Sequence, residues 1–300
     1  MLRCLGAAIL RPFVRRLSQK SPELKEVAFK WNSSDNILAS VVLSELIFRP
    51  NFVSATEESS LVAELDTHLS KHRYEDAHWD YAITHYRETE RKQWQNINRP
   101  VINRLKQFTV DCLRGPLSDR VEEIILPLIH VLDLSEEGEI KPHIDSVRSL
   151  CCGLCVKTNS RVFQPTDESP PIFPLVQYCG DCIAVVSLLS DSVLRLAVAP
   201  AEEVVGIPST HLHLLQVKLP PAPSYIDIYI PRRSIYVMRG ASRYLMTHAI
   251  LPQSEVCQLR HDFPLSGTYS AVRSRRISVI CRTRALDIVE LPKLEDAKSS

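Results

Sequence analysis

A His and an Asp stand two positions apart in the short segment from Lys141 to Asp145. In an extended strand, side chains at i and i+2 leave from the same face, about 7 Å apart along the chain, so His143 and Asp145 can converge on one metal ion. A 2-His-1-carboxylate triad holds non-haem Fe(II) and leaves other coordination positions open, but it needs a distant second His. His248 is the best candidate. A solvated strand carrying a His and an Asp would look the same.

A second pattern lies near the end of the chain. If the segment Arg276–Arg284 is a strand, Arg276 and Arg282 share one face. Two guanidinium groups directed into a β-barrel are costly unless they meet anions there. Arg forms bidentate contacts with carboxylates, and 2-oxoglutarate carries a carboxylate at each end. The pattern therefore indicates a dicarboxylic co-substrate.

The elements that would position these residues are short strands in the second half of the chain. They are rich in Val, Ile, Leu and Tyr and separated by Pro, Gly or Ser, which favours a sandwich or jelly roll over a parallel α/β sheet. The nine predicted strands are 128–134, 141–145, 183–189, 193–198, 211–219, 225–230, 234–238, 244–250 and 276–284.

Two helices are predicted before these strands. Ser54 and Glu57 have the spacing of a capping box, and apolar residues at helical spacing follow over 56–71. A second helix begins at Arg99, with Pro100 at the first turn. The segment 37–48 fits a helix or a strand. The predicted fold class is α+β, a double-stranded β-helix (jelly roll) with N-terminal helices packed on one sheet.

Charge is uneven along the 300 residues. The first 20 contain five Lys or Arg and no Asp or Glu, which is typical of a mitochondrial transit peptide; a secretory signal or a basic tail remain alternatives. Without them 31 basic residues face 35 acidic ones, so net charge gives no support for nonspecific nucleic-acid binding. The leader's apolar run, Cys4 to Leu10, is too short to span a membrane.

Two stretches could nevertheless contact a nucleic acid. Residues 72–94 are dense in aromatic and charged side chains, which could stack on a base or could pin a loop to the core. Residues 232–284 contain ten Arg and no Lys against two acidic residues. A local basic patch therefore remains an alternative despite the acidic balance of the whole chain.

The sequence as a whole resembles the AlkB-like Fe(II)/2-oxoglutarate-dependent dioxygenases, and their mitochondrial branch in particular. The resemblance covers residues 50–285, the predicted dioxygenase domain. The segments that carry it are 73–75, 78–80, 87–90, 130–134, 140–146, 187–190, 239–244 and 275–282, together with His248.

The resemblance implies roles for single residues. His143, Asp145 and His248 would bind iron, and no catalytic residue is expected beyond these ligands. Arg276 would pair with the distal carboxylate of 2-oxoglutarate, Tyr236 would hydrogen-bond to the co-substrate, and Arg282 would lie near its metal-chelating end. The family's nucleic-acid repair members have an Asn-x-Tyr pair ahead of the His-x-Asp motif, and two leucines, Leu132 and Leu134, stand there in this chain.

The implied reaction consumes O2 and 2-oxoglutarate and hydroxylates a C–H bond. The substrate is expected to be a protein or a small molecule, in the mitochondrial matrix, and the resemblance implies a role in fatty-acid metabolism and programmed necrosis. Demethylation of mitochondrial RNA is one alternative, and a non-catalytic interaction module is another. No membrane span is predicted, and a monomer is expected.

Four cysteines have a spacing close to that of a structural zinc site, namely Cys152, Cys155, Cys179 and Cys182. Spacing alone often misleads, and residues 149–177 also resemble an inserted loop within the dioxygenase domain. Residues 1–20 are expected to be the transit peptide and residues 286–300 a disordered tail.

Overall fold

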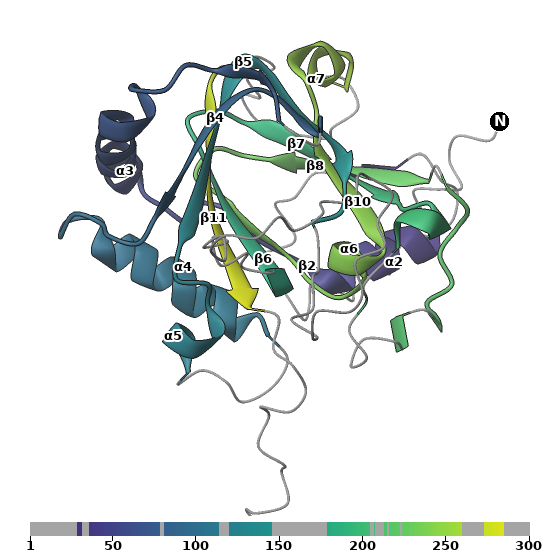
Figure 1. Ribbon diagram of the computed structural model, residues 1–300. Coiled ribbons are helices and arrows are strands. Elements are labelled where there is room, and N and C mark those ends of the chain that lie inside the picture. Colours follow the sequence, from purple (N-terminus) through teal and green to yellow (C-terminus); the bar gives the residue numbers. More distant parts are fainter. Residues whose placement is uncertain are drawn as a thin grey trace, which may run out of the picture.

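The structure is a computed structural model (Figure 1), and it describes residues 29–31, 36–78, 81–113, 120–145, 179–204, 207, 213–214, 216–222, 224–259 and 273–284. The predicted transit peptide, the inserted loop at 149–177 and the tail at 286–300 lie outside these ranges. None of the helices in the described ranges is long and apolar enough to cross a membrane.

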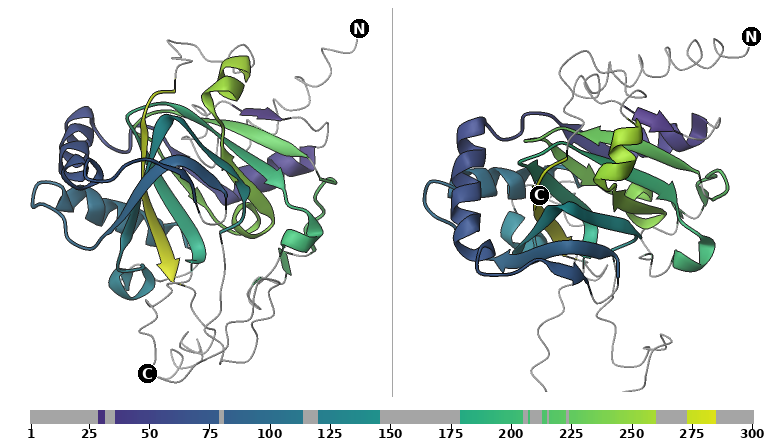
Figure 2. Two further views of the ribbon diagram at one scale, coloured as in Figure 1. Left: turned by 45° about the horizontal axis from the view of Figure 1, so that its top comes forward. Right: turned by 90° about the horizontal axis from the view of Figure 1, so that it is seen from above.

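A single curled antiparallel sheet dominates the described part of the chain (Figure 2), in the order β1-β8-β7-β10-β5-β11-β6-β9-β2, with β4 pairing β5 and β3. Its strands are β1 (Phe29–Trp31), β2 (Leu46–Arg49), β3 (Glu75–Ala77), β4 (Ile83–Arg91), β5 (Ile129–His143), β6 (Cys179–Leu188), β7 (Ser192–Val198), β8 (Tyr225–Ile230), β9 (Ile235–Met238), β10 (Met246–Ile250) and β11 (Arg276–Arg284). The predicted fold class is confirmed.

The sheet curls into a half-barrel with two halves, one formed by β1, β8, β7 and β10 and the other by β11, β6, β9 and β2. The long strand β5 joins these two halves. Its first part, around Val131, pairs with β11 on one side and β4 on the other, and its last residue, His143, pairs with β10. We predicted two separate strands at 128–134 and 141–145, and the structure has one. The polar residues between them remain in the strand because β4 supplies backbone partners there.

The described helices are α2 (Asn36–Glu45), α3 (Ala55–Leu69), α4 (Arg99–Asp111), α5 (Val121–Ile124), α6 (Ala241–Tyr244) and α7 (Gln253–Leu259). Helices α3 and α4 pack on the outer face of the sheet, whereas α2 sends Leu38 and Val42 to the cluster between the two halves of the sheet. Figure 1 shows α3 and α4 on the side of β5 and β11, away from α2 and α6. The capping box predicted for α3 is present, with Glu57 N donating to Ser54 Oγ at 3.1 Å and Ser54 N donating to Glu57 Oε2 at 2.8 Å.

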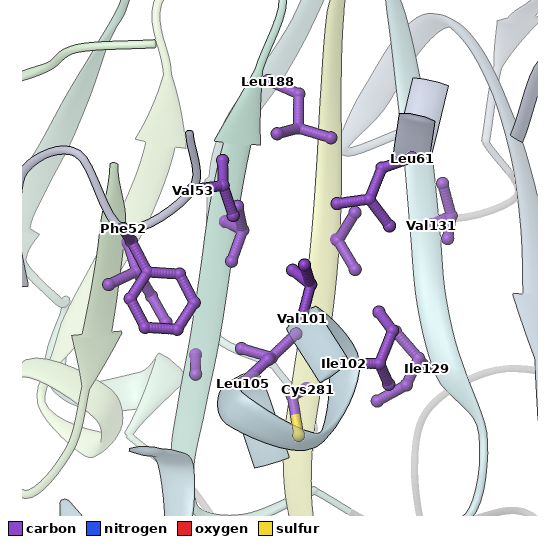
Figure 3. Close-up of a cluster of buried hydrophobic side chains, with 14 of the residues drawn as sticks. Phe52, Val53, Leu61, Val101, Ile102, Leu105, Ile129, Val131, Leu188 and Cys281 are labelled. Carbon is purple, nitrogen blue, oxygen red and sulfur yellow. The ribbon is translucent and has the colours of Figure 1, made fainter. Parts of the chain in front are cut away.

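Two apolar clusters lie on opposite faces of the sheet. The outer cluster, between α3, α4 and the sheet, contains Leu61, Leu105 and Cys281 (Figure 3). The inner cluster lies between the two halves of the sheet and contains Leu134 and Ile280. Because side chains alternate along a strand, β11 sends residues 277, 279 and 281 to the outer cluster and leaves the positions between them for the interior.

Three element predictions need correction. The segment 37–48 holds both a helix, α2, and the start of strand β2. Residues 211–219 were predicted as a strand, but their described members form short 3-10 segments, a bend and irregular chain, in a region with several prolines, which cannot donate to a ladder. Residues 83–91, which lie in the aromatic, charged stretch, form β4 because β5 is available to pair with them.

Candidate metal centre

Strand pairing brings the distant His to the His-x-Asp motif. His248 of β10 lies directly opposite His143 of β5 in the antiparallel register, and Asp145 follows two residues beyond the end of β5. The ligand atoms of His143, Asp145 and His248 lie within 4.8 Å of one another. The sequence named all three residues, and the register of β10 against β5 brings His248 beside the other two.

The contacts within this triad suit a divalent cation. Asp145 Oδ1 lies 3.3 Å from His143 Nε2 and 3.6 Å from His248 Nε2, and the two imidazole rings are 4.2 Å apart between centroids. His143 Nδ1 lies 2.9 Å from the carbonyl oxygen of Lys141, to which it can donate, leaving Nε2 directed to the centre. Two imidazole nitrogens and one carboxylate form the donor set that Fe(II) takes in non-haem sites.

The electrostatics keep the triad in the protonation states that a metal needs. Burial, the largest influence on Asp145, would raise its pKa, but Arg282, His143 and His248 together hold that pKa well below its usual range. Arg282 Nε lies 3.4 Å from Asp145 Oδ2. Burial and the neighbouring His143 lower the pKa of His248 to about 3, so its ring is neutral near pH 7. The group is therefore one anion with neutral imidazole beside it.

Arg276 lies deep in the same interior. Its side chain is fully buried; Nε donates to Ser187 Oγ at 3.0 Å, and Nη1 donates to the hydroxyl of Ser278. Nη2 is buried with no hydrogen-bond partner among the described residues. Tyr236 is also buried beside it; burial raises the pKa of the phenol, and the Arg276 charge acts in the opposite direction. An unmatched buried guanidinium beside a phenol suits a carboxylate supplied from outside the chain.

Arg282, the other predicted arginine of β11, is tied to the surface through a chain of polar contacts. Its Nη1 lies 3.1 Å from His130 Nδ1, and His130 Nε2 lies 2.8 Å from Glu88 Oε2. Both predicted arginines of β11, Arg276 and Arg282, face the interior, as the alternation of the strand predicted. Leu132 and Leu134 face it as well, and neither can hydrogen-bond to a ligand.

Sequence reasoning missed three polar residues of this interior: Ser187, His130 and Arg243. Arg243 is 2% exposed, and its charge acts on Asp145 and His248. One signal was present in the sequence, because Arg243 precedes His248 by five residues in a segment that carries the family resemblance. Ser187 and His130 also lie in such segments, 187–190 and 130–134, although the resemblance gave neither residue a role.

The proposed zinc site receives no support. Cys152 and Cys155 lie outside the described residues. Cys179 and Cys182 are both buried, but Cys179 belongs to the inner cluster and Cys182 to the outer one. Positions three apart in a strand point to opposite faces, so these two thiols do not converge on one ion.

The two stretches considered for nucleic-acid contact are largely used in packing. Tyr86 and Trp94 are buried, whereas Tyr81 is 73% exposed. In the Arg-rich segment, Arg232 pairs with Glu58 and Arg275 with Asp133, while others point into the interior. The described part of this segment is therefore mostly committed inside the fold or to ion pairs.

Two named proteins are similar to the chain along most of its length. No family model matches it. It is 30% identical over 250 residues, 83% of each chain, to a mouse protein named alpha-ketoglutarate-dependent dioxygenase alkB homolog 7, mitochondrial. A bovine protein of the same name is 31% identical over 246 residues, 81% of each chain.

Two solved structures are similar to the chain at low sequence identity. A Pseudomonas putida prolyl-4-hydroxylase matches at a TM-score of 0.46 and 11% identity, covering 84% of this chain and 100% of that one. The structure of OsALKBH1 matches at a TM-score of 0.39 and 12% identity, covering 79% of this chain and 97% of that one.

Proposed function

Because the chain belongs to the alkB homologue family of alpha-ketoglutarate-dependent dioxygenases, we propose that it hydroxylates a protein or small-molecule substrate in mitochondria, using iron held by His143, Asp145 and His248. The resemblance read from the sequence, to AlkB-like dioxygenases and to the seventh, mitochondrial homologue, is confirmed by this relationship. The protein is an enzyme, and its family uses Fe(II), 2-oxoglutarate and O2.

The observation that carries the proposal is the convergence of three side chains from separate parts of the sequence on one point. Two imidazoles and a carboxylate with ligand atoms within 4.8 Å of one another would hold a ferrous ion and leave coordination positions free for the co-substrate and O2. A ferrous ion and 2-oxoglutarate bound there would activate O2: one oxygen atom would enter succinate as 2-oxoglutarate loses CO2, and the other would be inserted into a C–H bond of the substrate.

Residues of the chain itself bind 2-oxoglutarate and keep the iron ligand Asp145 ionised. Arg276, with its unmatched Nη2, and Tyr236 receive the distal carboxylate of 2-oxoglutarate, while Ser187 and Ser278 fix the orientation of that guanidinium. Arg282 holds Asp145 ionised and lies where the co-substrate's metal-binding end would be. Leu132 and Leu134 line the interior and offer no hydrogen bond to a ligand.

The location, the biological role and the substrate class of the protein form a second part of the proposal. The two relatives are named mitochondrial, which supports a mitochondrial location for this protein. We propose the matrix, and a role in fatty-acid metabolism and programmed necrosis, from the family resemblance of the sequence alone. A protein or small-molecule substrate is favoured over RNA because the described aromatic and Arg-rich segments are mostly occupied in packing and in ion pairs.

Succinate release tests this function. The purified protein, loaded with Fe(II), would be supplied with 2-oxoglutarate and, in separate reactions, with mitochondrial protein fractions, mitochondrial small-molecule extracts and mitochondrial RNA. Stimulation by the protein or small-molecule fractions supports the proposal. Stimulation by RNA alone would establish the demethylase alternative, and no co-substrate turnover under any condition would favour the interaction module.

The control for this assay compares two variants in each of which one histidine is replaced by alanine. His143→Ala removes a ligand, whereas His68→Ala changes an exposed His in the last turn of α3, far from the triad in sequence and in the fold. Only the first change should abolish succinate release and Fe(II) binding. Equal loss in both variants would point to unfolding and would contradict the assignment.

A further inference from the structure

Arg243 is a buried cation that the proposed iron and co-substrate sites do not use. It lies in α6 and is 2% exposed. Its Nε donates to the carbonyl oxygen of Gly180 at 3.4 Å, and its guanidinium lies against the Cys179 thiol and 5.1 Å from the centroid of the Tyr244 ring. Nη1 and Nη2 are both buried, and neither has an oxygen or an anionic partner among the described residues. Burying a charge without hydrogen bonds to its polar atoms is strongly unfavourable, so an unmatched guanidinium calls for an anion.

The backbone around Arg243 is held in place. Gly240, directly before α6, has a φ of +51°, and a Cβ there would lie 2.7 Å from Glu45 Oε2. Ser242 Oγ accepts from Arg239 N at 3.1 Å and lies 2.8 Å from Arg239 O. A positive φ favours glycine, and these contacts fix the turn that aims α6 inward. Arg243 is therefore a fixed feature of the interior.

Arg243 shares this interior with the triad. Its charge acts on Asp145 and His248, and also on Cys179, which belongs to the inner cluster. The nearest acidic residue of β6, Asp181, already accepts a hydrogen bond from Tyr244 Oη at 2.6 Å. The interior thus presents more guanidinium charge than the carboxylate of Asp145 balances.

The distance between Arg243 and Arg276, which would bind the distal carboxylate of 2-oxoglutarate, follows from their contacts along strand β6. Arg243 contacts Gly180 near the start of the strand, and Arg276 contacts Ser187 near its end. Seven residues of extended chain cover about 23 Å. The four C–C bonds of a five-carbon diacid, about 1.5 Å each, span no more than about 6 Å. Curvature of the strand and the lengths of the two contacts shorten the separation but do not close this gap.

We propose that Arg243 binds a carboxylate of the primary substrate, which makes that substrate an acid held on the opposite side of the metal from the distal carboxylate of 2-oxoglutarate. The inference rests on the proposed function, because it places the substrate relative to the iron and the co-substrate. Arg suits this role since its planar fork donates two parallel hydrogen bonds to a carboxylate. The Arg243 side chain would orient the substrate; it takes no part in bond making or breaking.

Binding to the loaded but inactive protein tests this proposal. Mn(II) would replace Fe(II), 2-oxoglutarate would be saturating, and oxygen would be excluded. Calorimetric titration would compare acetate with acetamide and octanoate with octanamide, pairs that differ in the carboxylate. We expect at least one acid to bind at least about tenfold more tightly than its amide, as one charge-assisted contact would produce.

Three variants assign the effect. Arg243→Met keeps the length of the side chain without the charge and should abolish the preference for the acid, Arg243→Lys should retain part of it, and Arg120→Met, at an exposed position, should leave it unchanged. All variants should bind Mn(II) and 2-oxoglutarate as the wild type does. The melting temperature of Arg243→Met should be equal to or above that of the wild type, because the change removes an unmatched buried charge.

Each other outcome overturns the proposal. Equal binding of every acid and its amide by the wild type would exclude a carboxylate site, and an unchanged preference in Arg243→Met would place it elsewhere. A loss of 2-oxoglutarate affinity in Arg243→Met would assign Arg243 to the co-substrate. Failure of the wild type to bind Mn(II) and 2-oxoglutarate would instead remove the proposed function, a result visible before any acid is added.

Discussion

In the described part of the chain, buried charged side chains form ion pairs on the outer face of the sheet, whereas some on the inner face lack a partner for part of their polar atoms. On the outer, helix-backed face, the fully buried carboxylate of Asp133 meets Arg275 at 2.8 Å and Arg87 at 2.8 Å, and Glu64 meets Arg91 at 2.7 Å. On the inner face, Arg276 and Arg243 keep nitrogen atoms without partners among the described residues. The outer carboxylates and the inner guanidiniums are all at most 3% exposed, so the difference is whether an oppositely charged partner is present.

The contrast distinguishes structural charges from functional ones. A buried ion pair that is complete within the chain contributes to a unique fold, and removing one partner costs stability. A buried cation whose partner is missing from the chain lowers stability in the free protein and gains it back when a ligand anion binds. The inner arginines are expected to matter for ligands, and the outer ones for folding.

The largest expected effect falls on the inner face. His248→Ala removes one of three metal ligands, so Fe(II) binding should be lost and succinate release should fall by more than about 100-fold, beyond the effect of changing a residue that only supports a ligand. Metal content and turnover would be measured, with His68→Ala as the control. Retained iron and turnover would show that the third ligand is another residue.

On the outer face, Asp133→Ala should destabilise the fold by about 3 to 5 kcal/mol, because it leaves the guanidiniums of Arg275 and Arg87 without their buried partner. Urea unfolding would measure the free energy of unfolding. The 2-oxoglutarate affinity of the protein that remains folded should be unchanged. A variant as stable as the wild type would contradict the structural role of the outer pairs.

The inner counterpart is Arg276→Met. We expect the dissociation constant for 2-oxoglutarate to rise by about 10- to 100-fold, the effect of losing hydrogen bonds to a charged group, while the free protein keeps or gains stability. Titration with 2-oxoglutarate and thermal melting would be run together. Marked destabilisation with unchanged affinity would erase the distinction between the two faces.

The smallest effect concerns the chain of contacts that connects the surface to Arg282. The hydrogen bond with His130 lowers the pKa of Glu88, although burial opposes it. Its stabilisation is therefore present above the usual carboxyl pKa and is lost as the pH falls through the lowered folded value. Glu88 is partly exposed, so Glu88→Gln should cost less than about 1 kcal/mol at pH 7. Unfolding at neutral and acidic pH would measure a difference that shrinks in acid; a constant difference would contradict the linkage.

Local patterns in the sequence were sufficient for several parts of the fold and site. The capping box at Ser54 and Glu57 needs only neighbouring residues, and the alternation of β11 by itself placed Arg276 and Arg282 on one face. The spacing of His143 and Asp145 likewise placed both on one side of the chain. Each is a property of a few consecutive residues, set by the helical or extended backbone.

Local patterns could not predict which residues far apart in the sequence pair with one another. The strand β4 was missed because its charged residues find their partners on β5 and α3, and the predicted strand at 211–219 was wrong because nothing pairs with its described residues. The inward direction of Arg243 also depends on Glu45, about 200 positions earlier, which lies against Gly240.

The amino-acid order by itself determined which side chains could bind a metal and two carboxylates, since donor type and strand periodicity are local. Only the tertiary structure decided that His248 stands opposite His143, that β5 bends through both halves of the sheet, and that an unpredicted arginine enters the same interior. Register and curl depend on burying both faces of the sheet at once, a free energy summed over residues far apart in the chain.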